Sequence, residues 1–137
     1  MSHSRAPYHT TKPAELPRLS EAKLQQQCVQ WFTLQHPTLI LYANVNHGKR
    51  SKKAGYLEKL AGLTPGLPDL TLAALRGGYG GFYIELKAEG GRLSIHQTHM
   101  LAALEVAGYC CQVCYDFDAF KAAVTRYLSL APITSQR

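Results

Sequence analysis

Two short apolar segments on either side of a glycine-rich turn constrain the fold of this chain more than any other feature of its sequence. Residues 70–75 and 82–87 contain mainly apolar side chains, and residues 76–81 between them include four glycines. Such a pattern predicts an antiparallel β-hairpin. Because successive residues of a strand face opposite sides, Glu85 and Lys87 should share one face, which we place toward solvent, while the apolar side chains face the core.

Helices and two further strands are predicted around this hairpin. Capping residues and apolar repeats at helical spacing predict three helices, which begin after Ser20, after Ser94, and after Asp116 or Asp118. Strands are predicted at 39–45 and 109–115, and a long loop is predicted at 46–66. The element order α-β-β-β-α-β-α predicts an α/β fold in which a mixed β-sheet is flanked by helices.

The chain has 137 residues, which is long enough for one compact domain. Residues 1–19 lack apolar periodicity and are expected to form a flexible tail, residues 20–131 the domain, and residues 132–137 a short C-terminal tail. No apolar stretch approaches the roughly 18 residues of a membrane-spanning helix, and the start of the chain lacks the apolar segment of a secretory signal. We therefore expect a cytoplasmic protein with no membrane association.

The charge of the chain favours a polyanionic partner. Fifteen Lys and Arg residues against nine Asp and Glu residues give a formal net charge of +6, which by itself does not identify that partner. The densest basic segment contains a single acidic residue and is predicted to contact phosphates, with a solvated loop as the alternative. Its basic residues are Lys49, Arg50, Lys52, Lys53 and Lys59.

The cysteines and histidines do not predict a zinc site. Cys111 and Cys114 form a C-x-x-C pair, but residues three apart on a strand face opposite sides. We therefore interpret the cysteines as small buried apolar residues. His96 and His99 share a predicted helix without a third ligand nearby, and we interpret them as solvated side chains.

The hairpin should bring two carboxylates and a lysine together. With Leu75 and Phe82 as the pair that flanks the turn, the strand register follows. Asp69 then comes level with Lys87 and Ala88, within two residues of Glu85. Two carboxylates near one point repel each other unless a divalent cation lies between them, and oxygen ligands suit Mg²⁺ or Mn²⁺. Taken alone, a solvated Glu and Lys on an amphipathic strand would look the same, and a Pro-Asp pair is also typical of an ordinary turn.

The residues around this cluster resemble a known family. Asp69 is followed sixteen residues later by Glu85-Leu86-Lys87, which resembles the signature of the PD-(D/E)xK nuclease superfamily. Three longer segments are similar to the VRR-NUC branch of that superfamily: Gly66-Leu67-Pro68-Asp69-Leu70, Ile84-Glu85-Leu86-Lys87, and Gly91-Arg92-Leu93-Ser94 followed by Gln97. The resemblance covers about residues 20–130.

This resemblance implies a restriction-endonuclease-like core and hydrolysis of DNA to 5′-phosphate and 3′-hydroxyl ends. It implies that Asp69, Glu85 and the backbone carbonyl of Leu86 bind Mg²⁺ or Mn²⁺, and that Lys87 is catalytic. Stand-alone members, which occur in phages and bacteria, resemble Holliday junction resolvases, so we expect a homodimer that acts on branched DNA in a bacterial or phage-infected cell. Five residues could form the dimer interface, with core packing as the alternative: Trp31, Phe32, Tyr56, Leu57 and Leu60.

Two further residues have both a functional and a structural interpretation. A glutamate in the first helix commonly completes the site of the resembled family, and Glu21 is the only acidic residue of that predicted helix. It could equally stabilise the helix dipole. The family also places a glutamine beside the catalytic lysine, but Gln97 is in addition the third helical residue of a capping box that begins at Ser94.

A metal-dependent DNA endonuclease is the function that the sequence favours. A non-catalytic nucleic-acid-binding module is the alternative, but Asp69 and Glu85 beside a DNA surface would oppose the binding of phosphate unless a cation neutralised them. A small-molecule α/β enzyme has less support, because no glycine-rich phosphate loop follows a strand and opens a helix.

Overall fold

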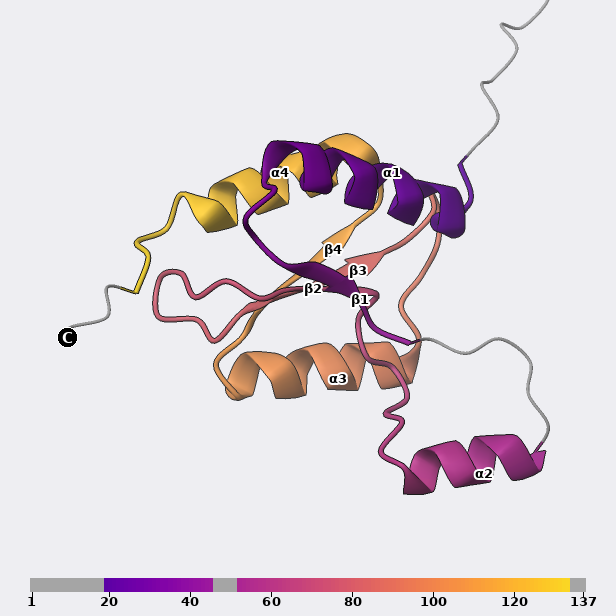
Figure 1. The fold of residues 1–137 in the computed structure, drawn as a ribbon. Coiled ribbons are helices and arrows are strands. Elements are labelled where there is room, and N and C mark those ends of the chain that lie inside the picture. Colours follow the sequence, from indigo (N-terminus) through magenta and orange to yellow (C-terminus); the bar gives the residue numbers. More distant parts are fainter. Residues whose placement is uncertain (1–18, 46–51, 134–137) are drawn as a thin grey trace, which may run out of the picture.

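Four helices and four strands form the described part of the chain (Figure 1). The structure is a computed structural model, and it describes residues 19–45 and 52–133. In chain order the elements are α1 (Glu21–Gln35), β1 (Leu41–Ala43), α2 (Lys52–Leu60), β2 (Leu70–Leu72), β3 (Phe82–Leu86), α3 (Ile95–Val106), β4 (Cys110–Cys114) and α4 (Phe117–Leu128).

The four strands form one mixed sheet in the order β1-β2-β3-β4. Strands β1, β2 and β3 are antiparallel to one another in turn, and β4 runs parallel to β3. Helices α1 and α4 lie together on one face of the sheet, and α3 lies on the other face (Figure 1). The predicted α/β class, with a mixed sheet flanked by helices, is therefore confirmed.

The core lies between the sheet and the pair formed by α1 and α4. On β3 the alternation is as predicted, because Phe82, Ile84 and Leu86 are all buried on this face. The helices contribute large side chains such as Phe32 from α1 and Phe120 from α4. Burial of apolar surface stabilises a fold by roughly 25 cal/mol per Å². This layer therefore fixes β3 firmly, and the opposite face of β3 carries the charged residues.

The predicted helix starts are confirmed by their capping interactions. The side chains of Ser20, Ser94 and Asp116 each accept a hydrogen bond from the backbone N–H three residues later. Asp118 is not the cap of α4 but lies in its first turn. Such caps satisfy N–H groups that a helix cannot pair internally, so they fix where α1 and α3 begin.

The loop predicted for residues 46–66 is wrong for residues 52–60, which form helix α2. Glycines and basic residues suggested a loop, but the Ala, Leu, Glu and Lys residues among them are strong helix formers. Helix α2 buries none of its side chains, and Tyr56, Leu57 and Leu60 are each more than half exposed. The element order is consequently α-β-α-β-β-α-β-α.

The hairpin is antiparallel as predicted, but its register differs. Leu72 pairs with Phe82, so the predicted pairing of Leu75 with Phe82 is wrong by three residues. Strand β2 ends early because the chain turns toward α4 after Leu72. There the Ala74 carbonyl accepts a hydrogen bond from the Tyr127 hydroxyl.

The cysteines lie as predicted from their spacing. Cys114 is buried in the core, whereas the Cys111 thiol approaches the Leu101 carbonyl of α3 at 3.8 Å on the other side of the sheet. All four cysteines are free thiols, and burial raises the pKa of both Cys28 and Cys111 to about 12. Cys111 and Cys114 thus face opposite sides of the sheet, as predicted, and their side chains pack against neighbouring elements.

Some predicted features fall outside the described residues. They are residues 1–18 and 134–137 of the expected tails and the basic residues Lys49 and Arg50. Across residues 19–45 and 52–133, no helix combines the length and the apolar character that crossing a membrane requires.

Candidate active site

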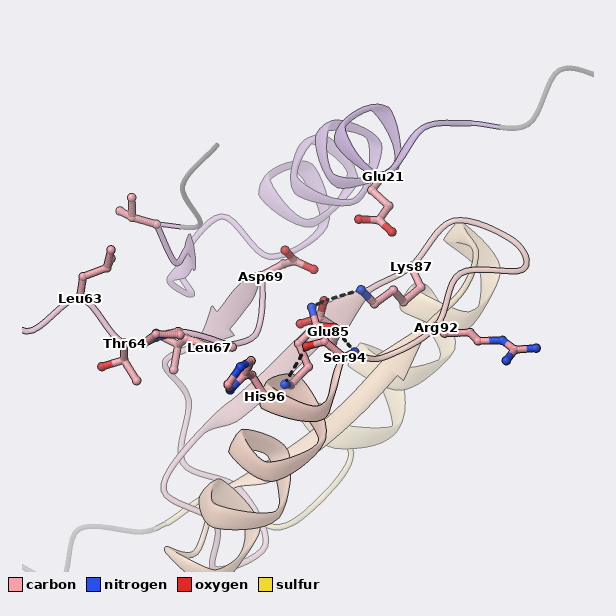
Figure 2. A pocket seen from close by; sticks show the side chains of 14 residues that line it. Glu21, Leu63, Thr64, Leu67, Asp69, Glu85, Lys87, Arg92, Ser94 and His96 are labelled. Carbon is pink, nitrogen blue, oxygen red and sulfur yellow. Dashed lines mark hydrogen bonds and ion pairs between the residues drawn. The ribbon is translucent and has the colours of Figure 1, made fainter. Parts of the chain in front are cut away.

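A cavity of about 570 Å³ opens where β3 ends, between the first residues of α1 and of α3 (Figure 2). Its wall combines acidic, basic and amide side chains with a short apolar segment that follows α2. The structure brings together on this wall all five residues predicted for catalysis: Glu21, Asp69, Glu85, Lys87 and Gln97. The other lining residues are Val45, Leu63, Thr64, Pro65, Gly66, Leu67, Arg92, Ser94 and His96.

Asp69 lies beside the end of β3. Leu70 pairs with Ile84, so Asp69 is level with Glu85, one residue beyond that pair on each strand. The Leu86 N–H donates a hydrogen bond of 2.7 Å to Asp69 Oδ2. Because the N–H and C=O groups of one strand residue point the same way, the Leu86 carbonyl is also directed toward the side of Asp69. The strand register thus places two carboxylates and one carbonyl near the end of β3.

Glu85 is almost completely buried, with 2% of its surface exposed. Its Oε1 accepts a hydrogen bond of 2.9 Å from Gln97 Nε2 and lies 3.6 Å from Lys87 Nζ, whereas its Oε2 has no hydrogen-bond partner among the described residues. Burial, and next the nearby Asp69 carboxylate, raise the pKa of Glu85 to about 8, although the Lys87 ammonium opposes this shift. A buried carboxylate oxygen without a partner costs free energy unless a proton or a cation satisfies it.

The expectation that Glu85 and Lys87 face solvent is wrong. Both are buried, because the cavity wall closes over this face of β3. Gly91 lies against the Lys87 side chain, so that a Cβ at position 91 would come within 3.5 Å of two Lys87 carbons. Alternation of residue types identifies the side chains that share a face, but it does not show what covers that face.

Gln97 completes the predicted capping box and also contacts the Glu85 carboxylate. Its Oε1 accepts a hydrogen bond of 2.8 Å from the Ser94 N–H, and its own N–H donates to Ser94 Oγ, which completes the capping box. Its Nε2 donates at the same time to Glu85. One amide therefore links the start of α3 to the buried carboxylate.

The segment that precedes Asp69 packs directly on the start of α3. Gly66 has a φ of +78°, and a Cβ at this position would lie 2.8 Å from both the carbonyl carbon and the carbonyl oxygen of His96. Only glycine accommodates both this backbone conformation and such a close approach. The contact holds Asp69 and Gln97 in a fixed relation, although they come from distant parts of the sequence.

Glu21 lies in the first turn of α1, where its Oε1 accepts a hydrogen bond of 3.4 Å from the Ala88 N–H. Figure 2 shows its carboxylate directed toward Asp69 and Lys87. This position is compatible both with a role in the site and with stabilisation of the helix dipole, because the start of α1 forms part of the cavity wall.

Two residues on the wall, Arg92 and His96, received no role from the sequence. Arg92 belongs to the Gly-Arg-Leu-Ser segment that contributed to the family resemblance. This membership was the sequence signal that could have indicated a place in the site. Figure 2 shows the Arg92 guanidinium group pointing away from Glu85. His96 is exposed, as predicted, but it also lines the cavity.

The donor set suits a hard divalent cation. Among the described residues no group of three His, Cys, Asp or Glu side chains could hold a metal ion, so a cation would depend on Asp69, Glu85 and a main-chain oxygen such as the Leu86 carbonyl. Carboxylate and carbonyl oxygens are the ligands of Mg²⁺ and Mn²⁺ in proteins. The unpartnered Oε2 of Glu85, buried next to a second carboxylate, is the observation on which this fit rests.

The basic residues of α2 lie outside the cavity. Lys52, Lys53 and Lys59 are exposed, and α2 projects away from the sheet (Figure 1). The chain that follows α2 leads into the cavity wall at Leu63 and Thr64. The lysines of α2 are therefore joined to the cavity wall only through the chain that follows the helix, and they do not line the cavity.

Comparison with known proteins bears directly on this architecture. The family model of the VRR-NUC domain matches residues 15–117. A solved structure described as a VRR_NUC domain protein is similar to this chain, with a TM-score of 0.67 and 23% sequence identity, over 87% of this chain and 96% of that chain. At this identity the likeness shows the fold, a restriction-endonuclease-like core. No curated protein sequence matches the chain.

Proposed function

Because this chain belongs to the VRR-NUC family of nucleases, we propose that it is a metal-dependent endonuclease that hydrolyses phosphodiester bonds of DNA. The observation that carries this proposal is the pair formed by Glu85 and Asp69. A buried carboxylate with one unpartnered oxygen beside a second carboxylate, in a cavity open to a ligand, is costly unless a proton or a cation satisfies that oxygen, and a divalent cation would satisfy both carboxylates at once.

The roles of the side chains follow from their contacts. Asp69, Glu85 and the Leu86 carbonyl would hold Mg²⁺ or Mn²⁺, which supplies a Lewis acid for the phosphate and makes water more acidic. Gln97 donates to Glu85 Oε1 and thereby orients the carboxylate. Lys87 Nζ, 3.6 Å from the same oxygen, carries a positive charge that can orient the attacking water or stabilise negative charge on the phosphate.

The cleavage of defined DNA substrates tests this proposal. We expect the purified chain to cut DNA with Mg²⁺ or Mn²⁺ and to leave it intact in EDTA. The panel contains duplex, single-stranded, flap and four-way-junction DNA, each labelled at one end. Binding of these substrates without any cleavage in either metal would support a non-catalytic nucleic-acid-binding module instead.

The raised pKa of Glu85 predicts how the stability of the metal-free protein depends on pH. The pKa is about 8 in the folded chain and near the ordinary value of 4.5 in the unfolded chain, so the folded state binds the additional proton between these values. This contribution is fully present below about pH 4.5 and is lost as the pH rises to about 8. In EDTA, the melting temperature of the wild-type protein should therefore fall relative to that of Glu85→Gln as the pH rises. Parallel curves for the two proteins would contradict the shift.

We further propose that the basic segment contacts the DNA backbone. Each phosphate contact contributes a slope of about 0.9 to the dependence of log affinity on log salt concentration. Replacement of Lys49, Arg50, Lys52 and Lys53 by Ala should therefore make this slope shallower, as measured by fluorescence anisotropy with labelled duplex in Ca²⁺. A slope equal to that of the wild-type protein would place the DNA elsewhere.

We also propose, more specifically, that the endonuclease is a homodimer that prefers four-way junctions. A symmetric junction requires two matched cuts, and a two-fold dimer supplies two acidic sites in related positions. Of the five residues considered for the interface, Phe32 is buried and Trp31 packs against the core, whereas three on α2 are exposed: Tyr56, Leu57 and Leu60. The α2 residues therefore remain as the interface candidates.

Light scattering should give a mass of about twice 15.2 kDa. A monomeric mass that persists when junction DNA is bound, or equal rates on plain duplex and on junctions, would contradict this finer proposal. Neither result would affect the assignment as a nuclease.

A further inference from the structure

Asn44, the residue after β1, makes three hydrogen bonds around Asp69. Its backbone N–H donates to the Asp69 carbonyl at 2.8 Å. Its side-chain Nδ2 donates to the Pro68 carbonyl at 2.8 Å and to Thr71 Oγ1 at 2.8 Å. Asn44 thus contacts the chain before Asp69, at Asp69 and after Asp69.

The segment around Asp69 needs such support. The regular pairing of β1 with β2 ends at Ala43 and Leu70, so Asp69 lies just beyond the paired region. The preceding residue, Pro68, has no backbone N–H, so it cannot donate a hydrogen bond to a neighbouring strand. The Asn44 side chain reaches across this end of the sheet and holds both the backbone before Asp69, at Pro68, and the Thr71 side chain after it.

We propose that Asn44 is a positioning residue, which holds the Asp69 carboxylate where it can act with Glu85. This inference rests on the proposed metal-dependent nuclease function. Asn44 acts through Asp69 and not on the substrate. Removal of a partner that orients a metal-binding carboxylate typically weakens metal binding 10–100-fold. The side-chain donor is the essential feature, because the backbone N–H of residue 44 is retained in any non-proline variant.

Hydrogen exchange provides a readout that needs neither metal nor DNA. The Leu86 amide is bonded to the Asp69 side chain, whereas the adjacent Lys87 amide is bonded to the Cys114 carbonyl within the sheet. Displacement of Asp69 should therefore expose the Leu86 amide and leave the Lys87 amide protected. The ratio of the two exchange rates separates positioning from a general loss of stability.

The variants Asn44→Ala and Asn44→Asp are compared in the full chain. The Asp variant keeps the shape of the side chain but removes its donor. In both variants we expect the Leu86 amide to exchange about tenfold faster relative to the Lys87 amide. A factor of about ten is the effect of losing a constraint comparable to one hydrogen bond. We also expect both to raise the calorimetric dissociation constant for Mn²⁺ about tenfold or more.

Tyr127→Phe is the matched control. It removes a side-chain hydrogen bond to a backbone carbonyl, that of Ala74 after β2, but on the side of the sheet that holds α1 and α4. It should leave both the exchange ratio and the Mn²⁺ affinity as in the wild-type protein.

Three results would overturn the positioning role: an unchanged exchange ratio in Asn44→Ala, wild-type Mn²⁺ affinity in that variant, or wild-type behaviour of Asn44→Asp. Failure of the nuclease proposal is distinguishable, because it would appear as a wild-type protein that cleaves no DNA, whatever the amides show.

Discussion

Asp69→Asn, Glu85→Gln and Lys87→Ala should each reduce the rate of DNA cleavage by about a thousandfold or more. Metal and charge stabilisation of a phosphoryl transition state contribute several kcal/mol, and about 4 kcal/mol corresponds to a factor of a thousand. Asp69 and Glu85 lie side by side at the end of the sheet, and Lys87 contacts Glu85. Removal of any one of them would therefore leave the proposed site without a charged group that it needs.

The rates are measured on labelled DNA with saturating Mn²⁺, and folding is checked by circular dichroism. The matched control is Asp118→Asn, which neutralises an exposed carboxylate that is paired with Lys121 on α4, away from the cavity. This variant should cleave DNA as the wild-type protein does. Glu21→Gln should reduce the rate less than the changes at Asp69 and Glu85, because Glu21 lies on the rim of the cluster.

Calorimetric titration separates the ligands from the lysine. Asp69→Asn and Glu85→Gln should weaken Mn²⁺ binding, whereas Lys87→Ala should not, because an ammonium group is not a metal ligand. Wild-type Mn²⁺ affinity in both carboxylate variants would show that the cation is bound elsewhere.

Gly66→Ala should destabilise the protein and disable the site together. A methyl group there would meet the backbone of His96 at 2.8 Å, and the φ of +78° is itself unfavourable for alanine. We expect a loss of about 3 kcal/mol in the free energy of unfolding, from the backbone conformation and the overlap combined. The segment before Asp69 would move away from α3, and a displacement of about 1 Å can lower a rate about a hundredfold.

Gly62→Ala separates the two causes. Gly62 also has a positive φ, +97°, but in the described part of the chain a Cβ there meets nothing within 4 Å. This variant should lose only about 1 kcal/mol and keep its cleavage rate. Urea unfolding and the labelled-DNA assay are applied to both variants. Equal effects of the two substitutions would show that the contact between Gly66 and His96 does not hold the site.

The sequence was sufficient for the elements that local chemistry determines. Ser20 and Ser94 mark the starts of α1 and α3 because their side chains satisfy helix N–H groups within a few residues. The alternation on β3 separates Ile84 from Glu85 because a strand has a period of two. Each of these signals lies within a few residues of the element that it determines, so the sequence alone reveals it.

Features that depend on distant contacts could not be predicted. The hairpin pairing stops at Leu72, and the chain after it turns toward α4, where the Ala74 carbonyl accepts a hydrogen bond from a tyrosine about fifty residues later. The burial of Glu85 depends on α3 and on the segment around Gly66, which no periodicity within β3 reveals. Asn44 showed no motif, because its partners in the Pro68 to Thr71 segment become neighbours only when β1 pairs with β2.

The double attachment of Gln97 limits which amino acids can occupy that position. The side chain must accept a hydrogen bond from the Ser94 N–H and donate one to Glu85, at the same time and from the same terminal group. Glutamate would keep the cap but lose the donor, lysine would provide a donor but no acceptor, and asparagine is one methylene shorter. A single-codon change from glutamine to glutamate would therefore preserve a well-formed helix while it adds a fourth carboxylate, besides those of Glu21, Asp69 and Glu85, to the cavity wall. We therefore expect that one mutation at this position would remove the proposed nuclease activity while the fold is kept.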